Sequence, residues 1–409
     1  MSAAPPLRPP TRLSALCMAC AGVAFLTGWL LVVLAAPDMV AFFYQPRVLA
    51  ITHTFTLGWI SLSMIGVLYQ YVPSLTKSPL AYPRLAGLQV GLFILGAAGM
   101  VAHFWMGRLN GMAWSAGVVL ASVLLFAGLL APSLARAPRY DATVIGISVA
   151  VASFVGTAAL GVLYAIDKVY PFLAGSVLSN IAAHAHLGLL GWITLTICAV
   201  SYRMVAAFLL PEVLFPAATR RQILLLAGLM PVLLTTLLSR WQTATFVVGC
   251  LVAIALAWYV IILWRLLQGR RMPVDWTLAH VLAALVHLAA AIGCGLALVV
   301  LVDPGSALGN RLVLAYGIFA LSGWISNFII GMATRMVPGL VGKGARPLLS
   351  ERGRALLFGL LNAGIAAAAM AALSASAPAL RLAALLPLAA GLLFCTTLLR
   401  RLSRPRPTS

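Results

Sequence analysis

The stretch Gly58-Trp59-Ile60-Ser61 recurs twice in this chain, as Gly191-Trp192-Ile193-Thr194 and as Gly323-Trp324-Ile325-Ser326. The three tryptophans are 133 and 132 residues apart. The similarity extends to three further aligned sets, which are Gly66, Ala199 and Gly331; Gln70, Arg203 and Arg335; and Val72, Val205 and Val337. Self-similarity at a fixed period indicates a chain built from repeated units. A unit of this length must contain several helices.

The composition places the chain in a membrane. Of its 409 residues, 63% are hydrophobic and 8% are charged, whereas soluble domains carry about 25% charged residues. A transmembrane helix needs about 20 apolar residues, and about twelve runs are long enough. These runs are 13–36, 47–73, 83–105, 110–133, 142–166, 175–209, 219–238, 243–267, 275–302, 308–337, 353–373 and 377–400. The sixth and tenth runs are long, so those helices are expected to tilt or to project beyond the hydrocarbon layer.

Twelve helices in three repeats give four helices to each repeat. The joints support this division, because Arg136–Asp141 opens the second repeat and Arg271–Asp275 opens the third. We therefore predict an all-α membrane protein with about twelve transmembrane helices, in three four-helix repeats with pseudo-threefold symmetry. The chain is predicted to form a single transmembrane domain, 1–409, with internal repeats at about 1–136, 137–271 and 272–409.

The net charge of +20 would suit a nucleic-acid-binding protein, but the placement of the basic residues points to a membrane. With the N-terminus inside, only six of the 27 Lys and Arg residues lie on the outer side, namely Arg47, Arg108, Lys168, Arg240, Arg311 and Arg381. This positive-inside bias predicts a bacterial-type inner membrane protein with both termini in the cytoplasm. The lipid bilayer, through its anionic headgroups, is the expected partner of this charge, and no nucleic-acid partner is expected.

Ionisable side chains within a membrane are functional candidates by default. All seven acidic residues fall at the ends of the predicted helices or in loops. A transporter is therefore the weaker hypothesis, because it would normally keep a carboxylate near the midplane and have inverted repeats. The six cysteines lie in apolar runs and are interpreted as packing residues. The polar groups left inside the predicted helices are mainly the histidines, His53, His103, His184, His186, His280 and His287.

His53 and His186 occupy the same place in two repeats, since each precedes its Gly-Trp pair by five residues. Neutral imidazole is a good ligand for heme iron and for copper. Two histidines from neighbouring helices can ligate one heme on both axial positions. His53 and His186 are therefore the preferred candidates for heme ligands, in the outer half of the membrane. In the third repeat Ile318 stands at this position, and Tyr316 stands at the position of His184.

The other histidines leave alternatives open. His184 and His186 are two residues apart, so on a regular helix they point about 200° apart and would serve two different sites. His280 and His287 are seven residues apart on one helix face, and either metal ligation or structural hydrogen bonding fits them. For His103, near the membrane surface, a structural role is preferred. The candidate metal ligands are thus His53, His184, His186, His280 and His287.

The remaining repeated residues are interpreted as structural. The glycine of each Gly-Trp pair allows two helices to approach closely, and the tryptophan fills the space beside it. Gln70, Arg203 and Arg335 are predicted to lie at cytoplasmic helix ends, where their side chains would extend to lipid headgroups.

This arrangement resembles subunit I of the heme–copper oxidase and nitric oxide reductase superfamily. The resemblance rests on three four-helix arcs with a histidine on the second helix of an arc, on the stretch His53–Pro73, and on His184–Trp192. NnrS-type heme- and copper-containing membrane proteins, which are linked to nitric oxide metabolism, are similar. The resemblance covers essentially the whole chain. It implies heme b as the cofactor, one or two per chain, with copper as a further candidate.

Several ligands of that superfamily are absent. Its low-spin heme is held by histidines on helices 2 and 10, and only His53 has such a place here. The histidine pair of helix 7 is missing from 219–238, and His184-Ala185-His186 stands where a His-Pro-x-x-Tyr motif would be. The chain is therefore not expected to assemble the oxygen-reducing heme–copper centre. By the same resemblance Arg381 is a candidate partner of the heme propionates, with Arg47, Arg108 and Arg311 as alternatives.

The sequence thus predicts an integral membrane b-type heme protein of the cytochrome oxidase subunit I-like fold, acting in electron transfer or in O2 or nitric oxide handling or sensing. A cytochrome c or another electron-transfer subunit is its expected partner, and whether the protein is an enzyme stays open. One alternative is a nitric oxide-linked reductase or detoxifying protein with heme and a non-heme metal, held by His184, His280 and His287. The other is a cofactor-free transporter or assembly partner.

Overall fold

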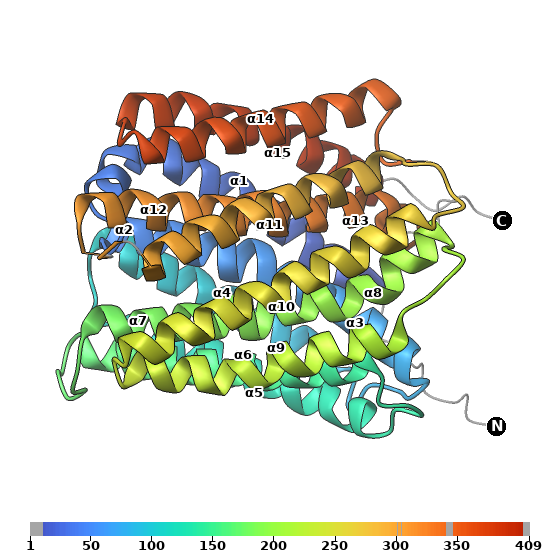
Figure 1. The fold of residues 1–409 in the computed structure, drawn as a ribbon, viewed down its shortest axis with the longest axis horizontal. Coiled ribbons are helices and arrows are strands. Elements are labelled where there is room, and N and C mark those ends of the chain that lie inside the picture. The colour runs from blue at the N-terminus through green and yellow to red at the C-terminus, as the bar shows by residue number, and fades with distance from the viewer. Residues whose placement is uncertain (1–10, 301, 304, 341–346, 404–409) are drawn as a thin grey trace. The chain divides into compact units, whose positions relative to one another are not determined.

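The computed structural model describes residues 11–300, 302–303, 305–340 and 347–403. Within these residues the chain is helical, and twelve helices are long and apolar enough to cross a membrane. Figure 1 shows them, coloured from blue near the N-terminus to red near the C-terminus. The predicted all-α membrane fold with twelve spans is confirmed.

The elements follow one another in a fixed order. They are α1 (Thr11–Ala41), α2 (Pro46–His53), η1 (Thr54–Ser61), α3 (Leu62–Thr76), α4 (Leu85–Met106), α5 (Met112–Ala135), α6 (Ala142–Asp167), α7 (Val177–His186), η2 (Leu187–Thr194), α8 (Leu195–Leu209), α9 (Pro216–Leu238), α10 (Gln242–Gln268), α11 (Trp276–Val300), α12 (Ala307–Gly317), η3 (Ile318–Ile325), α13 (Ser326–Leu340), α14 (Glu351–Leu373) and α15 (Ala377–Ser403). Three spans are composite, because α2, η1 and α3 form one continuous helix, as do α7, η2 and α8, and α12, η3 and α13.

The helices form two compact units. The first unit comprises the described residues of Tyr69–Gly96 and Leu109–Pro273, and therefore contains α5 to α10. The second comprises those of Pro10–Leu68, Ala97–Arg108 and Val274–Ser409, and contains α1, α2, η1 and α11 to α15. The prediction of a single domain with repeat boundaries near residues 136 and 271 stays a prediction.

Each composite helix contains a π-helical stretch at the Gly-Trp motif. These stretches are η1, η2 and η3, each eight residues long. In a π-helix the hydrogen bonds close over five residues instead of four. After each stretch a backbone N–H still reaches back five residues, from Leu62 to Leu57, from Leu195 to Leu190 and from Ser326 to Leu321. These π-helical stretches were not among the features predicted from the sequence.

The hydroxyl residue that ends the motif stabilises this wider turn. The Thr194 hydroxyl donates to the Leu189 carbonyl at 2.7 Å, and the Ser326 hydroxyl donates to the Leu321 carbonyl at 2.8 Å. Both bonds span five residues, which matches the spacing of the π-helical turn. The Ser or Thr of the motif therefore has a local structural role that its sequence position alone does not reveal.

In the second unit, the glycine of the motif lies where the second helix of a repeat crosses the first. A Cβ atom added at Gly58 would lie 2.7 Å from Cβ of Ala24 on α1. One added at Gly66 would lie 2.7 Å from Cβ of Cys17, seven residues before Ala24. Because such distances leave no room for a methyl group, both crossings depend on the missing side chain. Trp59 is fully buried beside them, with its ring centroid 5.0 Å from that of Phe25.

The other two repeats use the same crossing. In the first unit an added Cβ at Gly191 would lie 2.8 Å from Cβ of Ser153 on α6. At the second contact of this crossing the glycine lies on the first helix instead of the second. A Cβ added at Gly146 of α6 would lie 2.5 Å from Cβ of Ala199 on α8. In the third repeat, added Cβ atoms at Gly323 and Gly331 would lie 2.6 and 2.7 Å from Cβ of His287 and His280 on α11. In both repeats the two contact residues on the first helix are again seven residues apart. The three repeats therefore share this helix–helix contact as well as their sequence motif.

A second recurring contact joins helices within the first unit. The Tyr69 hydroxyl donates to Oε1 of Gln89 at 2.7 Å, and the Tyr202 hydroxyl donates to Oε1 of Gln222 at 2.9 Å. Each glutamine lies twenty residues after its tyrosine and is fully buried. Buried amide groups need hydrogen-bond partners. In each pair the tyrosine hydroxyl provides a donor for the glutamine side-chain oxygen.

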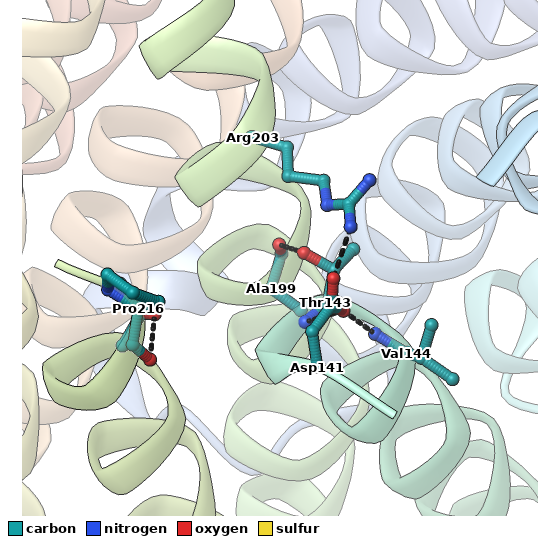
Figure 2. A network of polar contacts seen from close by, with 7 residues as sticks. Asp141, Thr143, Val144, Ala199, Arg203 and Pro216 are labelled. Atoms are coloured by element: carbon teal, nitrogen blue, oxygen red, sulfur yellow. Dashed lines mark hydrogen bonds and ion pairs between the residues drawn. The ribbon is translucent and has the colours of Figure 1, made fainter. Parts of the chain in front are cut away.

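Two aspartates join helix starts to helix ends. Asp141 caps α6, because its Oδ1 accepts from the backbone N–H groups of Thr143 and Val144, and its other oxygen forms an ion pair with Arg203 (Figure 2). Asp275 likewise pairs with Arg335 at 2.8 Å. Each arginine thus lies beside the carboxylate that begins the preceding helix of its repeat, and contact of these arginines with lipid headgroups stays a prediction.

We expect Gly66→Ala to destabilise the protein by about 1–3 kcal/mol, because the added methyl group overpacks the crossing. Adding Cys17→Gly should restore most of the loss, since this pair would copy Gly146 and Ala199. The measurement is thermal unfolding of the detergent-purified variants. Gly87→Ala is the control, because an added Cβ there has no neighbour within 4 Å. Equal stability of Gly66→Ala and Gly87→Ala would contradict the crossing as described.

Candidate heme and polar sites

His53 is the last residue of α2 and directly precedes η1. Its Nδ1 lies 2.8 Å from the backbone carbonyl oxygen of Leu49, one turn earlier. The ring is half-buried and stacks on Phe104 of α4, with centroids 5.0 Å apart and an angle of 26° between the planes. The hydrogen bond therefore holds one edge of the imidazole, and the stacked phenyl ring covers one of its faces.

His186 has the same local geometry in the other unit. It is the last residue of α7 and directly precedes η2. Its Nδ1 lies 2.8 Å from the backbone carbonyl oxygen of Ala182, and the ring is also half-buried. The two positions that the sequence repeat aligned thus share their secondary structure and their hydrogen bond.

This hydrogen bond defines the tautomer of both neutral imidazoles. A carbonyl oxygen only accepts hydrogen bonds, so Nδ1 must carry the proton in each ring. The lone pair is then on Nε2. Metal-ligating histidines commonly donate their other ring N–H to a backbone carbonyl, which fixes the ring and raises its basicity. His53 and His186 therefore have the donor chemistry that axial ligation of heme iron requires.

His184 packs on the first helix of its repeat. Its Cε1 lies 3.3 Å from the place that Cβ would take at Gly161 of α6, and its ring contacts Tyr164 edge to face. In the third repeat, Tyr316 packs on Gly295 of α11 in the same way, at 3.5 Å. Because residues two apart point about 200° apart on a helix, His186 points away from α6. The two histidines of helix 6 thus face different surroundings.

His280 and His287 belong to a buried polar cluster within the second unit. His280 Nδ1 lies 2.7 Å from Oδ1 of Asn327 on α13, and His287 Nε2 lies 3.0 Å from Oδ1 of Asn362 on α14. The two amides bond each other in both directions, at 3.0 and 3.2 Å. His280 and Asn327 are almost completely buried. We call these four side chains the His–Asn cluster.

Backbone carbonyl groups fix the direction of every bond in the His–Asn cluster. Each amide nitrogen also donates to the carbonyl one turn earlier, Asn327 to Gly323 at 2.7 Å and Asn362 to Phe358 at 2.9 Å. Both amide oxygens are therefore acceptors, and the imidazoles donate to them through His280 Nδ1 and His287 Nε2. The other nitrogen of His287 lies only 2.9 Å from the Cβ position of Gly323. It therefore faces the backbone of η3.

The charged and surface candidates lie elsewhere. His103 Nδ1 lies 2.9 Å from the carbonyl oxygen of Arg108, where it closes the end of α4. Arg47 pairs with Asp38 at 3.1 Å, and its guanidinium group lies over the Trp105 ring, 5.4 Å from the centroid. Arg381 is exposed in the first turns of α15. These positions suit the structural role that was preferred for His103.

Heme and copper make different demands on this chain. The two rings with Nε2 lone pairs fit axial ligation of heme, because one histidine on each side of the iron is sufficient. Copper sites usually gather several nitrogen or sulfur ligands. Among the described residues, no group of three or more His, Cys, Asp or Glu side chains could hold a metal ion. The residues present thus fit heme and do not fit a copper centre of that kind.

The comparisons with known proteins give the class of fold. No family model and no curated protein matches the sequence. Among solved structures, a heme–copper terminal oxidase, determined as a dimer by cryo-electron microscopy, is similar at a TM-score of 0.70 and 12% identity, over 97% of this chain and 85% of that chain. The molecule is therefore a multi-pass membrane protein with the heme–copper oxidase subunit I-like fold. The similarity to NnrS-type proteins stays a prediction.

The two asparagines of the His–Asn cluster were not predicted from the sequence. Asn327 lies three residues after Trp324, and the same place holds Leu62 and Leu195 in the other repeats. The sequence does contain an indication of this residue, because one repeat has a polar residue where the other two have leucine. Comparing the repeats residue by residue would have found it, whereas a search for ionisable groups does not detect an amide.

We expect Asn327→Leu to destabilise the protein strongly, although leucine stands at this position in the other two repeats. The change leaves His280 and Asn362 with buried unpaired groups, each costing about 1–3 kcal/mol. Chemical unfolding of purified protein measures the loss. In a double-mutant cycle His280→Leu should cost less in the Asn327→Leu background than in the wild type, because its partner is already gone. Strict additivity would contradict the cluster.

Proposed function

We propose that this protein is a b-type heme protein of the membrane, in which His53 and His186 are axial ligands. The observation that carries the proposal is the shared geometry of these two residues. Each ring donates Nδ1–H to the carbonyl of the preceding turn and holds its lone pair on Nε2. The fold, which is that of a heme–copper oxidase subunit, supports the proposal without identifying the cofactor.

Heme, when bound, supplies a one-electron iron couple. The chain contributes the ligand nitrogens and an apolar surrounding, which together tune the potential of the iron. At His53 the stacked Phe104 ring excludes water from one face of the imidazole. Electron transfer is therefore the proposed role, with O2 or nitric oxide handling or sensing as its variants in an inner-membrane respiratory setting. Whether the two histidines ligate the same heme stays a prediction.

The remaining parts of the proposal concern neighbours of the heme. Arg381 is proposed to hold the heme propionates, and Arg47 is the alternative. A cytochrome c or another electron-transfer subunit is the proposed redox partner. The positive-inside distribution of charge supports cytoplasmic termini in a bacterial-type inner membrane, and residues 1–10 and 404–409 lie outside the described residues.

The alternative with a non-heme metal gains less support from the geometry. It needs His184, His280 and His287 to gather around one ion. His287, however, uses Nε2 to bond Asn362, and its Nδ1 faces the backbone at Gly323, so neither nitrogen of this ring faces a place for an ion. We therefore favour the heme protein over the reductase with two kinds of metal centre.

We expect His53→Ala and His186→Ala each to abolish at least part of the heme signal. The reason is that alanine removes the Nε2 ligand while leaving the helix intact. The measurement is the reduced-minus-oxidised optical spectrum of the purified variant, with heme counted per chain by the pyridine hemochrome assay. Full heme content in either variant would remove that histidine from the ligand set.

His103→Ala is the matched control for these variants. It also removes an imidazole near a helix end, but one whose hydrogen bond only closes α4. Its heme content should equal that of the wild type. Complete loss of heme in His103→Ala, with the protein still folded, would contradict the assignment of His103 to a structural role.

A further inference from the structure

The end of α4 lies against α2, the helix whose last residue is the proposed ligand His53. Two neighbouring aromatic residues of α4 make the contacts. The Phe104 ring stacks on the His53 imidazole, with centroids 5.0 Å apart and 26° between the planes. The guanidinium group of Arg47, the second residue of α2, lies over the Trp105 ring, 5.4 Å from its centroid. We call these two contacts, which lie within the second unit, the aromatic clasp.

The aromatic clasp is tied to its surroundings through both helices. On α2, Arg47 also forms an ion pair with Asp38 of α1, at 3.1 Å. A cation over an aromatic face is attracted by the ring, so this arginine joins α1, α2 and α4. On α4, His103 Nδ1 lies 2.9 Å from the carbonyl oxygen of Arg108, a contact that closes the end of the helix. The two aromatic residues are therefore presented to α2 from a fixed helix end.

The hydrogen bond of His53 does not by itself fix the plane of its ring. Nδ1 lies 2.8 Å from the carbonyl oxygen of Leu49. This bond holds one atom of the imidazole, and the last torsion angle of a histidine side chain has a broad energy minimum. The ring can therefore tilt about the bond without breaking it. A second contact is needed to select one orientation.

Phe104 supplies this second contact. The residue is only 5% exposed, so its ring has little room to move. Two aromatic rings in offset stacking attract one another, and a flat partner favours those tilts of the imidazole that keep the rings nearly parallel. The hydrogen bond and the stacked ring together therefore determine the direction of Nε2 of His53.

The orientation of an axial imidazole matters to the heme that it ligates. The Nε2 lone pair lies in the plane of the ring, so a tilt of the ring changes the direction in which it binds iron. Groups that orient a metal ligand typically affect metal affinity or activity about 10–100-fold when they are replaced. Burial of the site also tunes the iron potential.

We propose that Phe104 is a positioning residue for the heme of His53, and that the aromatic clasp sets the plane of the His53 imidazole. The inference rests on the proposed function, because it concerns the same ligand. Without the Phe104 ring, His53 keeps its hydrogen bond to Leu49 and loses its fixed plane. Water then reaches the uncovered face of the imidazole. Since polar surroundings favour the ferric heme, which carries the larger positive charge, the iron potential falls.

The test is Phe104→Leu, which keeps an apolar side chain and removes the flat ring. The readouts are the electron paramagnetic resonance spectrum of the oxidised heme, which responds to the orientation of its axial imidazole, and the midpoint potential of the iron. Phe104→Leu should shift the g values and lower the potential, with a smaller loss of heme than in His53→Ala. Phe104→Tyr retains a ring that can stack, and should give the g values of the wild type.

Phe93→Leu is the matched control, because it makes the same substitution in the same helix. Phe93 is fully buried and contacts Phe154, at 6.0 Å between centroids, instead of a proposed ligand. Its g values and potential should equal those of the wild type. Equal shifts in Phe93→Leu and Phe104→Leu would show a general effect of loosened packing and would overturn the positioning role.

Two further outcomes separate the positioning role from the proposed function. A wild-type spectrum and potential in Phe104→Leu, in a protein for which His53→Ala loses heme, would overturn the positioning role alone. Full heme content in both His53→Ala and His186→Ala would overturn the proposed function, and the positioning role with it.

A second variant keeps the inference testable if Phe104→Leu does not fold. Trp105→Leu removes the other contact of the aromatic clasp and retains the stacked ring. It should shift the g values in the same direction as the loss of the clasp requires, away from those of the wild type, while Nδ1 of His53 keeps its bond. Circular dichroism and size-exclusion chromatography establish that the variant is folded. An unchanged spectrum in folded Trp105→Leu would overturn the proposal.

Discussion

Close contact between the first and second helices of each repeat is the constraint on which the structure depends. The contact exists because one of the two residues at each crossing lacks a side chain, as Gly58 does opposite Ala24 and Gly323 opposite His287. Small residues allow helices to pack closely where hydrophobic burial gives little advantage, as in a lipid bilayer. A buried tryptophan and a π-helical turn accompany this crossing in all three repeats.

The sequence predicted the helices well and their internal irregularity not at all. Twelve spans follow from the length of the apolar runs, which is a local property. The π-helical turns cannot be predicted from the length of an apolar run, because that length does not distinguish hydrogen bonds over five residues from hydrogen bonds over four. The ion pairs of Arg203 and Arg335 were missed for a related reason, since their partners begin helices about sixty residues away. Of the candidate site, the alignment of His53 with His186 predicted a shared geometry, whereas the asparagine partners of His280 and His287 required the structure.

Polar groups in this fold serve two different purposes. In the His–Asn cluster each amide oxygen accepts from an imidazole, and the donors of both amides are used. Such a closed network is strong where the dielectric constant is low, and it leaves little capacity for a ligand. At His53 and His186 the Nδ1–H donates to a backbone carbonyl of its own helix, so the ring does not depend on a polar side chain for that bond. We therefore propose cofactor binding in the first two repeats and packing in the third.

The most direct test of the central claim is the cofactor content of the wild-type protein. Detergent-purified protein from heme-sufficient cells would be examined by a reduced-minus-oxidised optical spectrum, a pyridine hemochrome assay and metal analysis on one sample. If the protein binds heme as proposed, the spectrum will show sharp b-type bands and the assay at least one heme per chain. Folded protein without heme would contradict the proposal, and would leave a cofactor-free transporter or assembly partner as the better description of this chain.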